Sequence, residues 1–426
     1  MKSNRIVLGV LSFAVAGALG CSSSPSGNPD GGTPDSGTPD GSTPIDGGGD
    51  GGAAKLYVYT STDFFSNTET SYMAATSSLG NVAPDYSKAV EIAGDALVAA
   101  ADTSSGTVYV TTDSASTISK YTVSHDGTFT AGDVLNLSAQ GFTGDDGHRG
   151  FMQFISASKA YLLDMNALQI IVWDPSAMTY MKTISLSQLS QNGLTPEANF
   201  QPRFRGSELV FSVHYSTGAV HTSTNDEKFV FVDTTADSVT VVDDAECGGL
   251  RETVVASNGD IYFGVGAAIS ADYYLGTPDV AVPCIVRIKS GEHVVDSTYK
   301  VDPGVLTGKQ TSGNLLAGPS DTFYVMGFDP ALYTGENPAT SDDYFYAQAW
   351  SYYQGTLGAT TAGSATLVAG VSTTVGATFP IEVDGLGYLV TIPNDWSATT
   401  LWDTSTTPPT SGFTMKQALG NVVRVY

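Results

Sequence analysis

The sequence predicts an all-β protein built from a repeated four-stranded sheet. Helical periodicity is nearly absent from its 426 residues. Short runs of β-branched and aromatic residues alternate with turns of Gly, Asp, Asn and Ser, which is the pattern of consecutive antiparallel strands. These runs also group into sets of four that recur about every 50 residues, so the chain contains a structural repeat.

The N-terminus has the features of a secretory signal. Lys2 and Arg5 form a basic region, and the apolar run IVLGVLSFAVAGALG follows and ends at Cys21. The run is too short and too rich in small residues at its end for a membrane span. Its ending, ALGC, resembles a bacterial lipobox, although Ala18 stands where Leu is usual; an ordinary cleaved signal with a chance cysteine is the alternative. We expect residues 1–20 to be a lipoprotein signal peptide and Cys21 to be lipidated.

The segment after the signal contains almost nothing that can be buried. Residues 22–54 read SSSPSGNPDGGTPDSGTPDGSTPIDGGGDGGAA. Such a segment cannot offset its ordering entropy, so residues 21–54 are expected to be a disordered tether. Ser22, rather than Asp, follows the cysteine, and the resemblance to Gram-negative lipoproteins implies an outer-membrane location, with the side of the membrane left open.

The composition restricts the partners of the remaining body, residues 55–426. The chain has 18 Lys+Arg against 43 Asp+Glu, and removing residues 1–20, with two cations and no acid, lowers the formal charge from −25 to −27. So acidic a surface argues against nucleic acid and against a membrane contact beyond the lipid anchor. Cys247 and Cys284 are the remaining cysteines, and in an oxidising compartment we expect a disulfide rather than a redox or metal site.

The sets of four runs are expected to form the successive sheets of a β-propeller. In chain order they read ALVAAAD, TVYVTTD, TISKYTVS, DVLNLS; RGFMQFIS, KAYLLDMN, QIIVWDP, YMKTISLS; QPRFRG, ELVFSVHYS, KFVFVDTT, SVTVVDDA; RETVVAS, DIYFGVGA, CIVRIKSG, HVVDSTYKVD; and SGNLLAGP, TFYVMGFD, YFYAQAW, ATLVAGV. About seven blades fit into the body, with LYVYTST and NVVRVY pairing the two termini. A pair of β-sandwiches is the alternative.

Cations recur at the predicted start of the inner strands. Arg149, Arg203 with Arg205, Arg251 and Lys309 follow one another at intervals of 54, 48 and 58 residues. The inner strands of a propeller begin on the face that carries the loops joining the second and third strands, where ligands usually bind. The pattern therefore predicts a ring of cations in a funnel. The alternative is that these cations pair with nearby carboxylates, such as Glu208, Glu252 and Glu382, and tie neighbouring blades together.

The predicted loops between second and third strands are long and carry aromatic residues. The candidate ligand contacts among them are Phe64, Phe65, His214, Tyr215, Tyr273, Tyr274, Trp396 and Trp402. Arginine offers forked hydrogen bonds to oxyanions and stacks on rings, so aromatic walls around arginines suit a planar anionic ligand. Packing and rim positions are the alternative for these side chains.

Catalytic patterns are absent from the sequence. It contains no HExxH, GxSxG, P-loop or CxxC motif, and its five histidines have no metal-ligand spacing. The run GDDGHR at Gly144–Arg149 has two adjacent carboxylates but lacks the alternating oxygen ligands of a calcium loop, so it is interpreted as a turn. We expect no catalytic residue, no bound metal and no cofactor of the protein's own.

The lipobox, the acidic tether, the opening YVYTSTDFF and TSYMAATSSLG, and the blade pattern together resemble the MxcI-like lipoproteins. These propeller-like proteins are found beside myxochelin-type siderophore genes and outer-membrane receptors. The resemblance covers most of residues 55–426 and rests on general pattern, without a diagnostic motif. It implies a role in ferric siderophore capture or uptake, with iron present only inside the ligand and an outer-membrane receptor as a candidate partner.

The sequence thus predicts a monomeric, lipid-anchored propeller that binds a small anionic aromatic ligand without chemistry. Two other classes stay open. One is a propeller enzyme of the lactonase or quinoprotein kind, which would need Ca²⁺ in the central channel. The other is a surface scaffold or adhesin whose loop face holds another protein.

Overall fold

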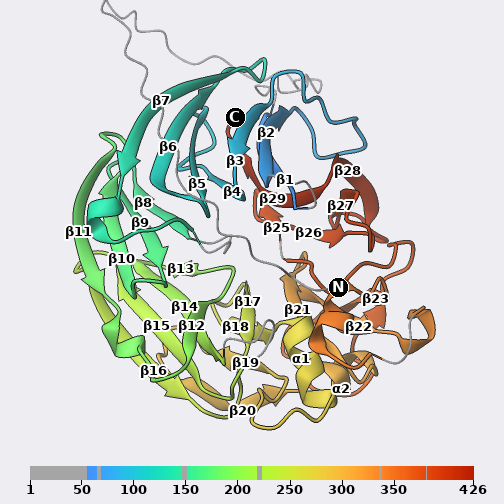
Figure 1. The fold of residues 1–426 in the computed structure, drawn as a ribbon. Coiled ribbons are helices and arrows are strands. Elements are labelled where there is room, and N and C mark those ends of the chain that lie inside the picture. Colours follow the sequence, from blue (N-terminus) through green and yellow to red (C-terminus); the bar gives the residue numbers. More distant parts are fainter. Residues whose placement is uncertain (1–54, 65–68, 146–150, 218–222, 335–337, 380) are drawn as a thin grey trace, which may run out of the picture. The chain divides into compact units, whose positions relative to one another are not determined.

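Seven antiparallel sheets follow one another around the ring of a β-propeller (Figure 1). The structure is a computed structural model, and it describes residues 55–64, 69–145, 151–217, 223–334, 338–379 and 381–426. The predicted signal peptide, tether and lipidated Cys21 lie outside the described residues, as do Phe65 and Arg149. No helix within the described ranges is long and apolar enough to cross a membrane. The prediction of an all-β propeller with about seven blades is therefore confirmed.

Each blade takes its strands from a continuous stretch of chain, except blade 1. Blade 1 contains β29 (Ala418–Arg424), β1 (Tyr57–Asp63), β2 (Thr70–Thr76) and β3 (Val90–Ala93). Blade 2 contains β4 (Ala96–Ala99), β5 (Thr107–Thr112), β6 (Ala115–Val123) and β7 (Phe129–Asn136). Blade 3 contains β8 (Met152–Ser156), β9 (Lys159–Asp164), β10 (Gln169–Asp174) and β11 (Thr179–Ser185). Blade 4 contains β12 (Thr195–Ala198), β13 (Arg203–Arg205), β14 (Glu208–Ser216), β15 (Glu227–Asp233) and β16 (Ser238–Asp244).

The last three blades carry the helices between their strands. Blade 5 contains β17 (Leu250–Val255), β18 (Ile261–Val265), β19 (Ile285–Ile288) and β20 (Val295–Val301), with α1 (Ala267–Tyr274) between β18 and β19. Blade 6 follows α2 (Pro303–Thr307) and contains β21 (Ser312–Ala317), β22 (Thr322–Phe328), β23 (Trp350–Thr356) and β24 (Thr366–Leu367), with α3 (Ser341–Tyr346) between β22 and β23. Blade 7 contains β25 (Ile381–Val383), β26 (Leu386–Thr391), β27 (Ala398–Asp403) and β28 (Thr410–Lys416).

The two ends of the described chain meet in blade 1. Strand β29 is the inner strand of that blade and pairs antiparallel with β1, with Tyr57 opposite Arg424 and Ser61 opposite Leu419 (Figure 1, blue beside red). This pairing confirms the prediction that LYVYTST and NVVRVY complete one blade. The ring is therefore closed by strand hydrogen bonds between segments from opposite ends of the sequence.

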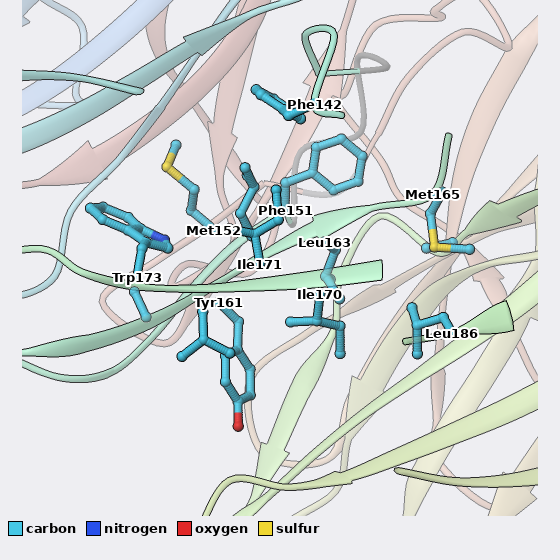
Figure 2. Packing of buried hydrophobic residues seen from close by; sticks show 14 of the residues in the cluster. Phe142, Phe151, Met152, Tyr161, Leu163, Met165, Ile170, Ile171, Trp173 and Leu186 are labelled. Atoms are coloured by element: carbon cyan, nitrogen blue, oxygen red, sulfur yellow. The ribbon is translucent and has the colours of Figure 1, made fainter. Parts of the chain in front are cut away.

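The burial of each strand follows from its place in its blade. In β10, QIIVWD, every residue from Gln169 to Trp173 is buried, because neighbouring blades cover both faces of a central strand. Ile171 and Trp173 lie in a cluster of apolar side chains with Leu163 and Phe151 (Figure 2). The outer strand β11, TYMKTIS, has no buried residue. Its two threonines, its lysine and its serine suit an outer edge, where a wholly apolar strand would invite pairing with another chain, and Tyr180 and Met181 are exposed among them.

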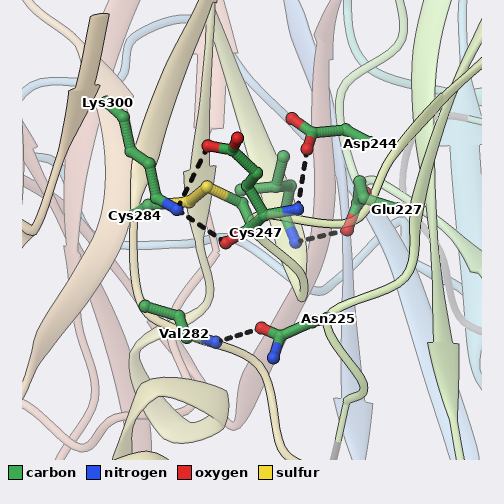
Figure 3. The surroundings of a disulfide bond; sticks show 9 residues. Asn225, Glu227, Asp244, Cys247, Val282, Cys284 and Lys300 are labelled. Atoms are coloured by element: carbon green, nitrogen blue, oxygen red, sulfur yellow. Dashed lines mark hydrogen bonds and ion pairs between the residues drawn. A yellow bond between two sulfur atoms is a disulfide. The ribbon is translucent and has the colours of Figure 1, made fainter. Parts of the chain in front are cut away.

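A disulfide joins blades 4 and 5. Cys247 lies in the connection from β16 to β17, and Cys284 directly precedes β19; they are bonded across 37 residues of sequence, which confirms the predicted pairing (Figure 3). Both cysteines are buried. Close by, the Leu250 N–H donates to Glu227 Oε2 at 3.3 Å. The disulfide therefore joins the connection between blades 4 and 5 to the start of β19, the third strand of blade 5.

Two predicted strands are corrected by the structure. The run YFYAQAW, predicted as the third strand of its blade, begins in helix α3, and β23 starts only at Trp350. Thr340 and Asp343 form a capping box, which satisfies free N–H groups and begins a helix there. The inner strand of blade 4 begins at Thr195 rather than at QPRFRG. The sequence TPEA of β12 looks unlike a strand, but Pro196 lies on the inner edge, where no ladder hydrogen bond needs its missing N–H.

Candidate functional site

A cavity of about 620 Å³ lies at the centre of the ring, on the face that carries the loops between second and third strands. Its lining comes from the starts of inner strands, such as Ala418 and Arg251, and from those loops, such as Gly266 and Asn394. Cavities of about 300–1,000 Å³ hold drug-sized ligands. The cavity therefore occupies the place where the sequence predicts a funnel, and its size fits a small molecule.

Aromatic side chains form part of the cavity wall. Its aromatic members are Phe64, Phe200, Phe345, Tyr346, Phe379 and Trp396. The Trp396 ring lies 6.5 Å from the ring of Phe64, 6.3 Å from that of Phe345 and 6.1 Å from that of Tyr346, centroid to centroid. Trp396 has a φ of 55°, which is strained for a bulky residue and recurs at binding sites. Loops of blades 1, 6 and 7 therefore build one aromatic cluster at the mouth.

A β-bulge brings two charged side chains to the cavity. Leu250 pairs with Val265 and Glu252 pairs with Gly264, so Arg251 is an extra residue in β17 without a partner on β18. Adjacent strand residues normally point to opposite faces, but here both Arg251 and Glu252 line the cavity. A Cβ on Gly266 would lie 2.9 Å from Arg251 Cδ, so the glycine makes room for the arginine.

The Arg251 guanidinium keeps donors available for a ligand. It lies over the Phe200 ring, with Cζ 4.3 Å from the centroid, and its Nη2 is 3.8 Å from Glu197 Oε2, beyond hydrogen-bond distance. Arg251 Nε has no hydrogen-bond partner in the described structure, although the side chain is only 17% exposed. The aromatic ring holds the guanidinium in place without using its N–H groups.

The Glu252 carboxyl is fully buried beside this arginine. Neither carboxyl oxygen has a hydrogen-bond partner of normal geometry among the described residues. Burial raises the pKa of Glu252 to about 8, and the charge of Arg251 and the Leu315 backbone N–H limit the rise. A pKa near 8 favours the protonated form of the carboxyl at pH 7. The cavity lining thus carries the Arg251 guanidinium and the protonated Glu252 carboxyl as hydrogen-bond donors, and a second acidic side chain, Asp95.

Of the predicted contacts that the structure describes, three line the cavity, namely Arg251, Phe64 and Trp396. Lys309 precedes the inner strand of blade 6 as predicted, but its Nζ lies 2.8 Å from Asp329 Oδ2 and the residue does not line the cavity. Phe65 and Arg149 lie outside the described residues. The cations therefore do not form the predicted ring among the described residues.

His214 and Tyr215 are strand residues, so their placement in a loop is wrong. Strand β14 continues to Ser216, and both side chains are buried in the body of blade 4. His214 Nε2 lies 3.4 Å from Glu197 Oε2, and the Tyr215 hydroxyl donates to the Leu189 carbonyl at 2.8 Å. These contacts connect elements within the blade and leave the cavity to other residues.

Tyr273, Tyr274 and Trp402 also lie away from the cavity lining. Tyr273 is exposed on α1, and the Tyr274 hydroxyl lies 3.1 Å from Asp302 Oδ2. Trp402 belongs to strand β27 rather than to a loop, and its Nε1 donates to Thr391 Oγ1 at 2.9 Å. The sequence analysis placed these residues in long loops, whereas the structure has a helix at Tyr273 and Tyr274 and a strand at Trp402.

Arg203 and Arg205 lie at the other end of their inner strand, next to the turn into β14. Both side chains contact blade 5, so they point to the same face of the strand, as the two-residue spacing predicts. Arg203 donates to the Thr253 carbonyl, and Arg205 donates to the Glu292 carbonyl at 2.9 Å. Arg203 Nη2 also lies 2.6 Å from Glu382 Oε2 on blade 7. The alternative interpretation, that these cations tie blades together, therefore describes them.

We expect the variant Arg203→Met to lose about 2 kcal/mol of free energy of unfolding, because it leaves the part-buried Glu382 carboxylate without its cation. Urea unfolding at pH 7 measures the loss. The double variant Arg203→Met with Glu382→Gln should recover part of it, since no unpaired charge then remains. If the losses of the two single variants, Arg203→Met and Glu382→Gln, simply add in the double variant, the two side chains do not interact directly.

Sequence reasoning missed Glu252, Phe200, Phe345, Tyr346 and Phe379. Glu252 was considered only as a nearby carboxylate that could pair with an inner-strand arginine. Phe200 stands between the two parts of a divided inner strand, and Phe345 and Tyr346 belong to the helix taken for a strand. A bulge and a capping box, rather than residue type, decide these positions.

Within the described ranges, no group of three or more His, Cys, Asp or Glu side chains is arranged to hold a metal ion. The GDDGHR run, from Asp146 onward, lies outside those ranges, so its interpretation as a turn stays a prediction. The candidate site is accordingly built from aromatic rings, Arg251 and Glu252.

The comparisons with known proteins concern the fold. No family model and no curated protein matches the chain. Among solved structures, the periplasmic gluconolactonase PpgL of Pseudomonas aeruginosa is similar with a TM-score of 0.52 at 9% identity, over 87% of this chain and 99% of that one. A putative 6-phosphogluconolactonase of Bacteroides uniformis has a TM-score of 0.50 at 10% identity, over 87% and 100%. At such identities the likeness shows that the chain has a propeller fold, and it carries no activity.

Proposed function

We propose that this protein is an extracytoplasmic binding protein that holds a small aromatic anion in the central cavity. The observation that carries the proposal is Arg251, which is held over the Phe200 ring at 4.3 Å while its Nε lacks a partner in the described structure. Such a guanidinium gives an anion strong charge-assisted hydrogen bonds. The rings at the mouth supply flat apolar surface for the remainder of the ligand.

The charge of the cavity favours a ligand with one anionic group. Arg251 is the one cation among the described residues that line it, and Asp95 lies on the same lining. The whole chain carries a formal charge of −25, so a ligand with several charges outside the Arg251 contact would be repelled. Size and charge together fit an aryl ring system with a single carboxylate or phenolate.

Calorimetric titration of 2-naphthoate into the purified full-length chain tests this proposal. We expect saturable binding, and binding weakened roughly 10- to 100-fold in Arg251→Met, because a charge-assisted hydrogen bond contributes about 1.5–3 kcal/mol. Lys309→Met is the matched control, since this cation begins the next blade but contacts Asp329 instead of the cavity. No binding by the unaltered chain, or equal losses in the two variants, would contradict the proposal.

A ferric catecholate is the specific ligand that we propose from the family resemblance, with capture at the outer membrane, a lipid anchor at Cys21 and delivery to a receptor. The aromatic wall supports it, whereas the single cation in the described lining favours one exposed anionic edge of such a complex. Parallel titrations with a ferric bis-catecholate and its iron-free form distinguish the possibilities. Tighter binding of the ferric form supports the iron role; equal or weaker binding removes it and leaves the aromatic-anion site intact.

A further inference from the structure

The Glu252 carboxyl is buried in the cavity lining without forming an ion pair with a described residue, and this burial needs an explanation. It is fully buried, it lines the cavity, and neither of its oxygens has a hydrogen-bond partner of normal geometry in the described structure. The neighbouring Arg251 approaches a different carboxylate, because its Nη2 lies 3.8 Å from Glu197 Oε2. An isolated buried carboxylate costs several kcal/mol, so such a group takes up a proton or a partner.

We propose that Glu252 binds the ligand as a protonated acid and donates its proton to one carboxylate oxygen of the aryl anion, while Arg251 donates to the same carboxylate. This inference rests on the proposed function and specifies its ligand as an aryl monocarboxylate. The proton remains bonded to Glu252 and forms a hydrogen bond to the ligand oxygen, so no covalent bond is made or broken. Hydrogen bonds from an acid to a carboxylate are short and strong, and burial strengthens them further.

A protonated Glu252 carboxyl removes one negative charge from the surroundings of an entering anion. If Glu252 were ionised, its negative charge would lie beside Arg251 on a lining that already includes Asp95, and an entering anion would be repelled more strongly. When the carboxyl is protonated, the Arg251 Nε–H, which has no hydrogen-bond partner in the described structure, can donate to the anion. A bound anion favours the protonated acid in turn, because a nearby negative charge disfavours ionisation of a second acid. Binding and protonation are therefore mutually reinforcing.

Other ionisable groups around the carboxyl must be separated from it in a test. In the described structure they are Arg251 on β17, Glu197 on β12 with His214 on β14, Asp95 ahead of β4, and Tyr346 on α3. Asp95 already accepts a hydrogen bond of 2.6 Å from the Thr62 hydroxyl. Burial raises the pKa of Tyr346, which keeps that phenol protonated. Measurements above pH 7.5 avoid the ordinary titration range of histidine.

The pH dependence of 2-naphthoate binding is the first test. The probe's own carboxylate stays ionised throughout, whereas Glu252 has a pKa of about 8. We expect a nearly constant Kd below pH 7.5 and a Kd that rises about tenfold between pH 8.5 and 9.5, because the acid must regain its proton on binding. In Glu252→Gln, whose amide donates without titrating, the Kd should be independent of pH over this range.

Proton uptake on binding is the second test and needs no variant. Titrations at pH 9 in buffers of different ionisation enthalpy give the protons taken up per ligand, which should approach one in the unaltered chain and zero in Glu252→Gln. Glu227→Gln is the matched control, because Glu227 is also fully buried with a raised pKa but does not line the cavity. It should keep the uptake.

The outcomes separate the two proposals. Binding without proton uptake, or uptake that persists in Glu252→Gln, overturns the shared-proton inference and leaves the aromatic-anion site standing. Absence of 2-naphthoate binding at every pH overturns both proposals. Uptake that disappears only in Glu252→Gln supports both.

Discussion

Replacing Glu252 by Gln should stabilise the fold increasingly as the pH rises. Burial raises the pKa of this carboxyl from 4.5 to about 8 in the folded protein. Between these values the folded state holds a proton that the unfolded state has released, so raising the pH favours unfolding of the unaltered chain. The amide of the variant has no such proton. The difference in free energy of unfolding should grow by about 1.4 kcal/mol per pH unit from pH 4.5 and level off near pH 8.

Urea unfolding at half-unit steps from pH 4.5 to 9 measures this difference, which should reach roughly 4–5 kcal/mol. Glu91→Gln is the control, because Glu91 is exposed on β3 and should leave the pH dependence unchanged. A second buried acid, Glu227, also has a raised pKa, so the unaltered chain alone will show a steeper dependence than Glu252 explains. A pH-independent difference between Glu252→Gln and the unaltered chain would show that the carboxyl is ionised and paired.

Reduction of the Cys247–Cys284 disulfide should cost roughly 4 kcal/mol of free energy of unfolding. The bond closes a loop across 37 residues, and a crosslink of that length removes considerable entropy from the unfolded chain. The thiols stay in place after reduction, so packing around them changes little. Urea unfolding of the same protein with and without reductant, with thiol counting to verify reduction, measures the effect. Equal midpoints for the fully reduced and oxidised proteins would contradict it.

Residue pattern determined the fold more completely than it determined the site. Short continuous apolar runs such as KAYLLD and QIIVWD identified strands correctly, because the inner strands of a blade are covered on both faces. The terminal runs identified the closing pair for the same reason. Where the sequence failed, in TPEA and YFYAQAW, a local feature outweighed composition: an inner edge that tolerates Pro196, and a capping box that begins a helix.

Prediction of the site depended on backbone irregularities that residue types do not reveal. Arg251 was identified because cations recur at blade intervals, yet Arg203 satisfied the same pattern and lies at the opposite end of its strand. Glu252 became a lining residue through a one-residue bulge, and the register of β17 cannot be read from its letters. Phe64 and Trp396 were found because their loops are long and aromatic. The recurrence of cations and the long aromatic loops therefore located part of the cavity lining, and the backbone irregularities decided the remainder.

The pairing of β1 with β29 also determines when the protein can finish folding. Tyr57 and Arg424 are 367 positions apart, the difference of their numbers, whereas blades 2 to 7 each use neighbouring strands. Contacts so distant in sequence form late, because a long loop must close first. During synthesis, the inner edge of β1 therefore stays unpaired until β29 has been made. The ring cannot close before that strand is available.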